Sequence, residues 1–150
     1  MFNIIGADIE GASMLDLFAG TGGVGIEALS RGAAFVRFVD RERLAVQTIK
    51  ANLQNTGLIE GSEVLHADAF RTIESSPDRV FDYVYIAPPQ YKSLWKQALQ
   101  SLDAHFGWLS EDAWVIVQIH PVEFEPVELK NLEEFDRRTY GRTLLLFYRV

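Results

Sequence analysis

The sequence contains no cysteine, which excludes disulfide bonds, cysteine-based zinc sites and thiol nucleophiles. No apolar run approaches the ~18 residues that a membrane-spanning helix requires. Residues 1–6 are too short for a secretory signal and lack its basic flank. The three histidines are scattered without the paired spacing of metal ligands. We therefore expect a cytoplasmic protein with no metal and no membrane partner.

Positive charge is also scarce, because 14 lysine and arginine residues face 21 aspartate and glutamate residues, and none of the basic residues precedes Arg31. The net charge of −7 argues against a large surface that coats nucleic acid, although a small basic patch remains compatible with it. Residues 1–6 resemble the last turn of a helix that ends at glycine. We expect residues 1–150 to be a single domain and a monomer, lacking a native N-terminal segment that carried positive charge.

Short apolar segments alternate with helical patterns along most of the chain. The predicted strands are residues 14–18, 35–39, 63–66, 80–86 and 113–119, and the predicted helices are residues 24–31, 44–53 and 91–102. Residues 135–140 and 143–150 flank Gly141 and Arg142, which predicts an antiparallel hairpin. The acidic stretch 123–134 is interpreted as a solvated connection. This order predicts an α/β, Rossmann-like fold whose sheet is mainly parallel and ends in an antiparallel hairpin.

A glycine-rich turn, Gly20-Thr-Gly-Gly-Val-Gly25, follows the first predicted strand and precedes a helix. Glycines let the backbone approach a ligand closely, and the following helix offers unpaired N–H groups. Asp40 comes twenty residues after Gly20, at the end of the next strand, where a carboxylate accepts hydrogen bonds from ribose hydroxyls. The alternative for Asp40 alone is a helix N-cap. Together these features predict a site for an adenosine-containing cofactor.

A dinucleotide-dependent dehydrogenase and an S-adenosylmethionine-dependent methyltransferase both fit this spacing. Asp16, at the end of the first strand, would repel a pyrophosphate but would receive the cationic amine of a methionine moiety. Asp68, after the third strand, is placed to accept from an adenine amino group, with Ala69 and Phe70 offering backbone and apolar contacts; a helix cap is its alternative role. The double proline after the fourth strand has no evident task in hydride transfer. The residues favour the methyl donor.

The run Asp16-Leu-Phe-Ala-Gly-Thr-Gly-Gly-Val-Gly-Ile-Glu-Ala-Leu-Ser-Arg-Gly-Ala33 resembles the cofactor loop of RsmD-type methyltransferases, which modify the N2 amine of a guanine in small-subunit (16S) ribosomal RNA. The resemblance extends from about Phe2 to the C-terminus. It implies the seven-stranded methyltransferase sheet, S-adenosylmethionine as cofactor, and ribosomal RNA or the small ribosomal subunit as partner. The predicted cofactor-binding residues are Asp16, Phe18, Ala19, Gly20, Gly22, Asp40, Arg41, Asp68, Ala69 and Phe70.

The chain departs from the family pattern after the fourth strand, where the family has Asp or Asn, two prolines and an aromatic residue. Here the run is Ala87-Pro-Pro-Gln-Tyr91, and the predicted catalytic residues are Pro88, Pro89, Gln90 and Tyr91. An aromatic amine is a poor nucleophile until acceptors bind its N–H groups and orient its lone pair. Ala87 lacks that acceptor, which leaves the Pro88 carbonyl and Gln90 Oε1, while Tyr91 would stack on the base.

Three other functions remain open on the sequence alone. A catalytically impaired module that binds RNA or protein fits an intact glycine turn beside an altered proline motif. A small-molecule methyltransferase fits the acidity and the lack of a basic surface. A dehydrogenase would be indicated by nicotinamide binding.

Overall fold

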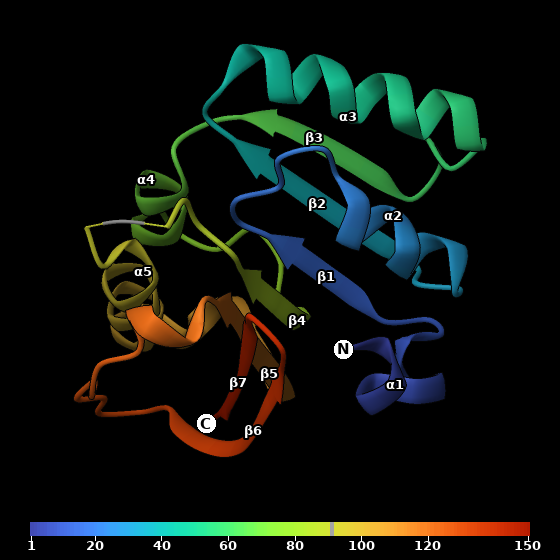
Figure 1. The fold of residues 1–150 in the computed structure, drawn as a ribbon. Coiled ribbons are helices and arrows are strands. Elements are labelled where there is room, and N and C mark those ends of the chain that lie inside the picture. The colour runs from blue at the N-terminus through green and yellow to red at the C-terminus, as the bar shows by residue number, and fades with distance from the viewer. Residues whose placement is uncertain (91) are drawn as a thin grey trace. The chain divides into compact units, whose positions relative to one another are not determined.

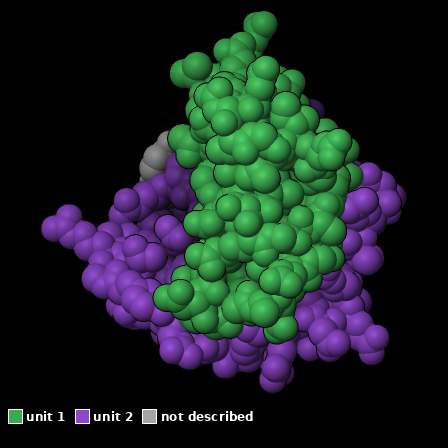
Figure 2. Space-filling model, turned by 90° about the vertical axis from the view of Figure 1, so that its right-hand side faces the viewer, with its two compact units in different colours: residues 1–69 green, residues 70–150 purple. Residues whose placement is uncertain are grey.

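The computed structural model describes residues 1–90 and 92–150, which form two compact units (Figure 1). The first unit comprises residues 1–69 and the second residues 70–150, as coloured in Figure 2. Tyr91, one of the predicted catalytic residues, lies outside the described residues. The organisation of the chain as a single domain stays a prediction. Within the described part of the chain, no helix combines the length and apolar character needed to cross a membrane.

The first unit is a three-stranded parallel sheet in the order β3-β2-β1, covered by helices. Its elements are α1 (Phe2–Ile5), a 3₁₀ helix (Gly6–Ile9), β1 (Ser13–Asp16), α2 (Gly23–Ser30), β2 (Phe35–Asp40), α3 (Arg43–Thr56) and β3 (Ser62–His66). Helix α2 packs on β1 and β2, and α3 packs on β2 and β3 (Figure 1). Val36 and Phe38 of β2 are fully buried, as expected for a strand in a parallel sheet.

The second unit is a four-stranded mixed sheet in the order β4-β5-β7-β6. Its elements are α4 (Ala69–Glu74), which starts at the last residue of the first unit, β4 (Phe81–Ile86), α5 (Leu94–Ala104), a 3₁₀ helix (Phe106–Trp108), β5 (Leu109–Ile119), a 3₁₀ helix (Pro121–Glu123), β6 (Glu133–Tyr140) and β7 (Thr143–Arg149). Strands β4 and β5 are parallel, whereas β7 is antiparallel to both β5 and β6.

The predicted fold class is confirmed, because the described residues form seven strands in an α/β arrangement with an antiparallel hairpin at the C-terminal end. The hairpin turns at Gly141 and Arg142, as predicted. Two elements start three or more residues away from their predicted starts. Helix α5 begins at Leu94 rather than at residue 91, because Lys92 and Ser93 have positive φ. Strand β5 begins at Leu109, four residues before the predicted start.

The prediction of a solvated acidic connection at residues 123–134 is wrong in part. Leu132 is buried, and the buried carboxylate of Asp103 on α5 holds the segment. This carboxylate accepts hydrogen bonds from the backbone N–H groups of Lys130, Asn131 and Leu132 at 2.8, 2.8 and 2.7 Å. Three backbone donors compensate the desolvation of the charge. The connection is therefore packed onto α5 despite its acidic composition.

Gly25 in α2 is required by close packing against β2. A Cβ atom at this position would lie 2.3 Å from Phe38 Cε1 and 2.8 Å from Val36 Cγ1. We expect Gly25→Ala to lower the free energy of unfolding by about 3 kcal/mol and the melting temperature by about 10 °C. At Gly23 of the same helix, a Cβ would approach Thr21 Oγ1 only to 3.8 Å. Gly23→Ala is the matched control; thermal unfolding that shows equal losses for both variants would contradict the packing argument.

Candidate functional site

The carboxyl ends of β1, β2 and β3 lie at the same edge of the first unit's sheet. The parallel register pairs Asp16 with Phe38 and Asp40 with His66. The glycine turn follows β1 directly and is tied to β2 by a hydrogen bond from Ala19 N to Val39 O, at 3.0 Å. In parallel α/β sheets this edge is where ligands bind. The structure thus places the turn, Asp16 and Asp40 where the cofactor was predicted.

The turn presents an open backbone surface at its exposed residue Gly20. Gly20 has φ +60°, and a Cβ built there would meet no atom within 4 Å. Gly22 is the left-handed N-cap of α2 and donates from its N–H to Ala19 O at 2.8 Å. Asn52 Nδ2 on α3 donates to Thr21 O at 3.0 Å, which holds the far side of the turn. The loop is therefore anchored to α3 through Thr21, while its backbone at Gly20 is open to close approach by a ligand.

Asp40 holds the turn and its own strand end together. Its Oδ2 accepts a hydrogen bond from Gly20 N at 2.9 Å, and its Oδ1 accepts one from Glu42 N at 2.8 Å. A carboxylate has about four lone-pair positions, so both oxygens retain acceptor capacity. Because the side chain is half-buried, a ribose at this edge has access to it. The alternative role of Asp40, the N-cap of the next helix, is not observed, because the N-cap of α3 is Glu42 and Asp40 bonds the N–H of that residue before the helix begins.

Asp16 carries the clearest sign of a missing partner. Its side chain is 1% exposed, and its Oδ1 has no hydrogen-bond partner among the described residues. Burial raises the pKa of Asp16 to about 7, a hydrogen bond from the Phe18 backbone opposes this shift, and the charge of Asp40 adds to it. A buried carboxylate oxygen without a donor is costly. A cationic amine would satisfy this oxygen, so the residues present fit the methionine moiety of S-adenosylmethionine.

The raised pKa of Asp16 predicts how the stability of the ligand-free protein depends on pH. Below pH 4 the carboxyl is protonated in both the folded and unfolded states, whereas between pH 4 and 7 only the folded state holds the proton. The free energy of unfolding therefore falls as pH rises through this window, by on the order of 2 kcal/mol between pH 5 and pH 7. Asp16→Asn does not titrate and should lose this component. Urea unfolding measures the difference; parallel pH profiles for the two proteins would contradict it.

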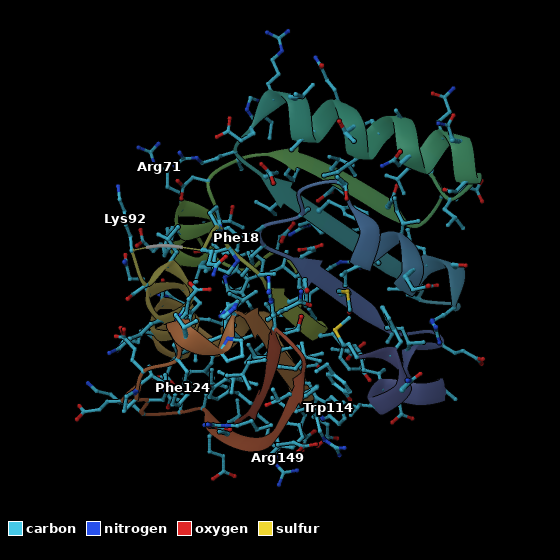
Figure 3. The ribbon with its side chains drawn as sticks, in the orientation of Figure 1. Phe18, Arg71, Lys92, Trp114, Phe124 and Arg149 are labelled. Atoms are coloured by element: carbon cyan, nitrogen blue, oxygen red, sulfur yellow. The ribbon has the colours of Figure 1, made fainter. Side chains whose placement is uncertain are left out.

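Of the other predicted cofactor residues, all but Phe70 belong to the first unit. Phe18 is half-buried in the turn (Figure 3), and Ala19 is buried. Arg41 is exposed, its Nε lies 3.4 Å from Glu42 Oε1, and its backbone oxygen lies 2.9 Å from His66 Nε2. Asp68 is half-buried just before α4. Ala69 is the buried first residue of that helix, whereas Phe70 belongs to the second unit.

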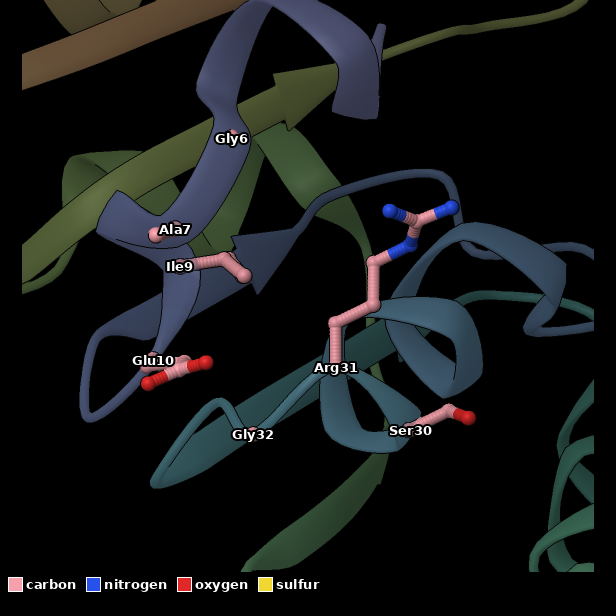
Figure 4. Close-up of a pocket in the computed structure, with 7 residues that line it drawn as sticks. All are labelled: Gly6, Ala7, Ile9, Glu10, Ser30, Arg31 and Gly32. Carbon is pink, nitrogen blue, oxygen red and sulfur yellow. The ribbon is translucent and has the colours of Figure 1, made fainter.

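A separate cavity of about 640 Å³ lies in the first unit, away from this edge (Figure 4). Its lining residues are Gly6, Ala7, Ile9, Glu10, Ser30, Arg31 and Gly32. Glu10 comes just before β1 and Gly32 just before β2, so the cavity lies toward the amino ends of the strands. The Arg31 guanidinium stacks over the Phe2 ring at 5.0 Å and pairs with Glu27 at 3.5 Å. This cavity is therefore distinct from the predicted cofactor site.

The proline motif follows β4 in the second unit. Ala87 and Pro88 are half-buried, while Pro89 and Gln90 are exposed. Lys92 (Figure 3) and Ser93, which follow the motif, have φ of +61° and +51°, the only positive values among the described non-glycine residues. Such conformations store strain and gather at functional sites. The exposed Gln90 and the half-buried Pro88 are accessible for the roles predicted from the sequence.

Two supporting residues were missed by the sequence reasoning. Asn52 braces the glycine turn, and Glu125 accepts hydrogen bonds from Ser93 Oγ at 3.2 Å and Lys96 Nζ at 2.8 Å. The hydrogen bond from Lys96, followed by that from Ser93, lowers the pKa of Glu125. Asn52 shows no signal in the sequence beyond a polar position on a helix. Glu125 could not be distinguished from the other glutamates of the acidic stretch 123–134.

Comparison with known proteins gives matches over nearly the whole chain. The family model described as conserved hypothetical protein 95 matches residues 1–149. The putative rRNA methyltransferase YlbH of Bacillus subtilis is 38% identical over 152 residues, which cover 99% of this chain and 82% of that protein. Ribosomal RNA small subunit methyltransferase D of Escherichia coli is 31% identical over 120 residues, which cover 79% of this chain and 58% of that protein.

A solved structure agrees with these matches. The putative methyltransferase yhhF from Escherichia coli superimposes with a TM-score of 0.87 and 26% identity, covering 98% of this chain and 81% of that one. The similarity thus extends through both units. The chain spans less than two thirds of the length of the small subunit methyltransferase D of Escherichia coli.

Proposed function

The chain belongs to the family described as conserved hypothetical protein 95, and from this membership we propose that it transfers a methyl group from S-adenosylmethionine to the N2 amine of a guanine in small-subunit ribosomal RNA. The predicted resemblance to the RsmD-type methyltransferases is confirmed by the matched relatives, as is the methyltransferase class of the enzyme. The cofactor, the RNA substrate and the residue roles below are parts of the proposal.

The observation that carries the cofactor assignment is the buried, unpartnered Oδ1 of Asp16 beside the glycine turn. S-adenosylmethionine supplies an activated methyl group on a sulfonium. In the proposal, Asp16 binds the methionine amine, Asp40 accepts from the ribose hydroxyls, and Asp68 accepts from the adenine amino group. The open backbone at Gly20 lets the cofactor approach closely. These residues bind and orient the cofactor and take no part in proton transfer.

The substrate amine is proposed to bind at the proline motif of the second unit. The backbone carbonyl of Pro88 and Gln90 Oε1 accept its two N–H groups, which draws the nitrogen lone pair out of the ring and makes the amine a better nucleophile. Tyr91 stacks on the base in this proposal, and Pro89 keeps the motif rigid. Positioning contributes more than proton abstraction, because the methyl group is already activated.

Ala87 favours a second candidate function, a protein of the same fold that binds cofactor and RNA without turnover. The family's acceptor side chain is missing at this position. Removal of one preorganised hydrogen bond of this kind costs ~10²–10³ in rate. This candidate shares every binding residue with the first one and differs only in the chemical step.

The decisive experiment incubates the full-length protein with labelled S-adenosylmethionine and unmodified small-subunit RNA, both free and in assembled particles. Nuclease digestion then identifies the labelled nucleotide. Label on guanine N2 supports the proposal. Cofactor binding without any transfer supports the non-catalytic candidate, and label in a metabolite fraction with unlabelled RNA indicates a small-molecule methyltransferase. A protein that binds no S-adenosylmethionine by isothermal titration overturns the cofactor assignment.

A further inference from the structure

The backbone directly after the proline motif is held in an unfavourable conformation. Lys92 and Ser93 both have positive φ, and Ser93 is the left-handed N-cap of α5. Neither residue is glycine, so each is strained relative to a relaxed backbone. Such a conformation persists only where the surrounding contacts impose it. The contacts at this turn therefore fix the backbone two residues after Gln90, the last described residue of the motif.

Side chains from two separate segments hold this turn. From α5, Gln97 Nε2 donates to Lys92 O at 2.7 Å, and Gln97 N donates to Ser93 O at 3.1 Å. From the segment after β5, Glu125 accepts from Ser93 Oγ at 3.2 Å through Oε2 and from Lys96 Nζ at 2.8 Å through Oε1. Glu125 is thus the contact that joins the turn to a segment about thirty residues further along the chain.

The segment that carries Glu125 is itself anchored on α5. The indole of the fully buried Trp95 donates from Nε1 to Glu123 O at 3.3 Å, and its ring stacks on Phe124 with centroids 6.2 Å apart and planes at 19°. His120 and Glu123 form a capping box at the 3₁₀ helix Pro121–Glu123. Trp95 and this capping box hold the backbone next to Glu125 in place. The half-buried carboxylate of Glu125 can therefore restrain Ser93 through its hydrogen bond.

We propose that Glu125 is a positioning residue for methyl transfer, which holds the turn at Lys92 and Ser93 and thereby orients Pro88 and Gln90 toward the substrate amine. This inference rests on the proposed function. Without the carboxylate, Lys92 and Ser93 relax toward negative φ, and the acceptors of the motif shift. A displacement of about 1 Å in such a group costs on the order of 10²-fold in rate. Glu125 contacts neither cofactor nor base in this role.

The test compares Glu125→Ala with Glu125→Gln in the full chain, and uses Glu128→Ala, an exposed glutamate of the same segment, as the matched control. For Glu125→Ala we expect kcat to fall about 10- to 100-fold, while the dissociation constant of S-adenosylmethionine changes less than twofold. Glu125→Gln keeps an acceptor for Ser93 Oγ and should recover most of the loss. Glu128→Ala should match the parent protein.

Amide hydrogen exchange at Gln97, whose N–H donates to Ser93 O at 3.1 Å, provides a readout that does not depend on turnover. Glu125→Ala should accelerate exchange at this amide about tenfold or more, with Glu125→Gln between that variant and the parent. Unchanged exchange together with unchanged kcat overturns the positioning role, and so does a loss of kcat that Glu125→Gln fails to recover. If the parent protein transfers no methyl group, the proposed function fails, while the exchange rates still show whether Glu125 holds the turn.

Discussion

Asp40→Ala is expected to weaken the binding of S-adenosylmethionine about 100-fold or more. The substitution removes the acceptors for the ribose hydroxyls, and each hydrogen bond to a charged acceptor contributes about 1.5–3 kcal/mol. It also releases Gly20 N and Glu42 N, which Asp40 binds at 2.9 and 2.8 Å, so the glycine turn loses the contact that ties it to β2 through this side chain. Isothermal titration measures the effect directly.

The control for Asp40→Ala is Glu42→Ala, which removes an exposed carboxylate two residues away. Among the residues that the structure describes, the Glu42 side chain pairs only with Arg41. Its removal should change the affinity for S-adenosylmethionine less than twofold. Circular dichroism establishes that both variants keep the fold. An affinity for Asp40→Ala within threefold of the parent protein would leave the carboxylate as a structural brace of the glycine turn and remove it from the cofactor site.

The alternation of strands and helices was predictable because each buried strand appears as a short apolar run. Once the strands are parallel, their carboxyl ends share an edge, so the positions of Asp16 and Asp40 followed from the chain order alone. The short helix α4 was missed, since six residues are too few to show a repeated apolar pattern, although Ala69 and Ile73 lie one turn apart and are both buried. The early start of β5 was missed because the exposed Glu111 and Asp112 interrupt its apolar pattern.

The supporting contacts of the candidate site could not be predicted from the sequence, for a different reason. Glu125 meets Ser93, and Asn52 meets Thr21, across about thirty residues of chain. No periodicity encodes such pairs, because each depends on how two helices or loops pack. Only the structure shows that Asp16 Oδ1 has no hydrogen-bond partner among the described residues. The position of Asp16 near the end of the first strand was predicted from the sequence. Sequence therefore predicted the edge of the sheet at which Asp16 and Asp40 lie, and packing determines how their side chains are held.

Ala87→Asp is expected to raise the rate of methyl transfer about 10²-fold without changing the affinity for S-adenosylmethionine. Ala87 is the first residue after β4 and is half-buried, so a carboxylate there would stand at the start of the proline motif in partial contact with solvent. It would accept one N–H of the substrate amine, which leaves the Pro88 carbonyl for the other and frees Gln90 from that task. One preorganised hydrogen bond to the reacting group contributes ~10²–10³ in rate.

Two further variants separate hydrogen bonding from a change in shape. Ala87→Asn supplies a neutral acceptor and should give part of the gain, whereas Ala87→Val adds volume without an acceptor and should give none. Single-turnover measurement with labelled cofactor and small-subunit RNA reports the chemical step itself. Equal rates in the parent protein and Ala87→Asp would mean that Pro88 and Gln90 already satisfy the amine. A gain in Ala87→Asp from an undetectable parent rate would instead identify the parent as a binding protein, whose chemistry was lost with one side chain.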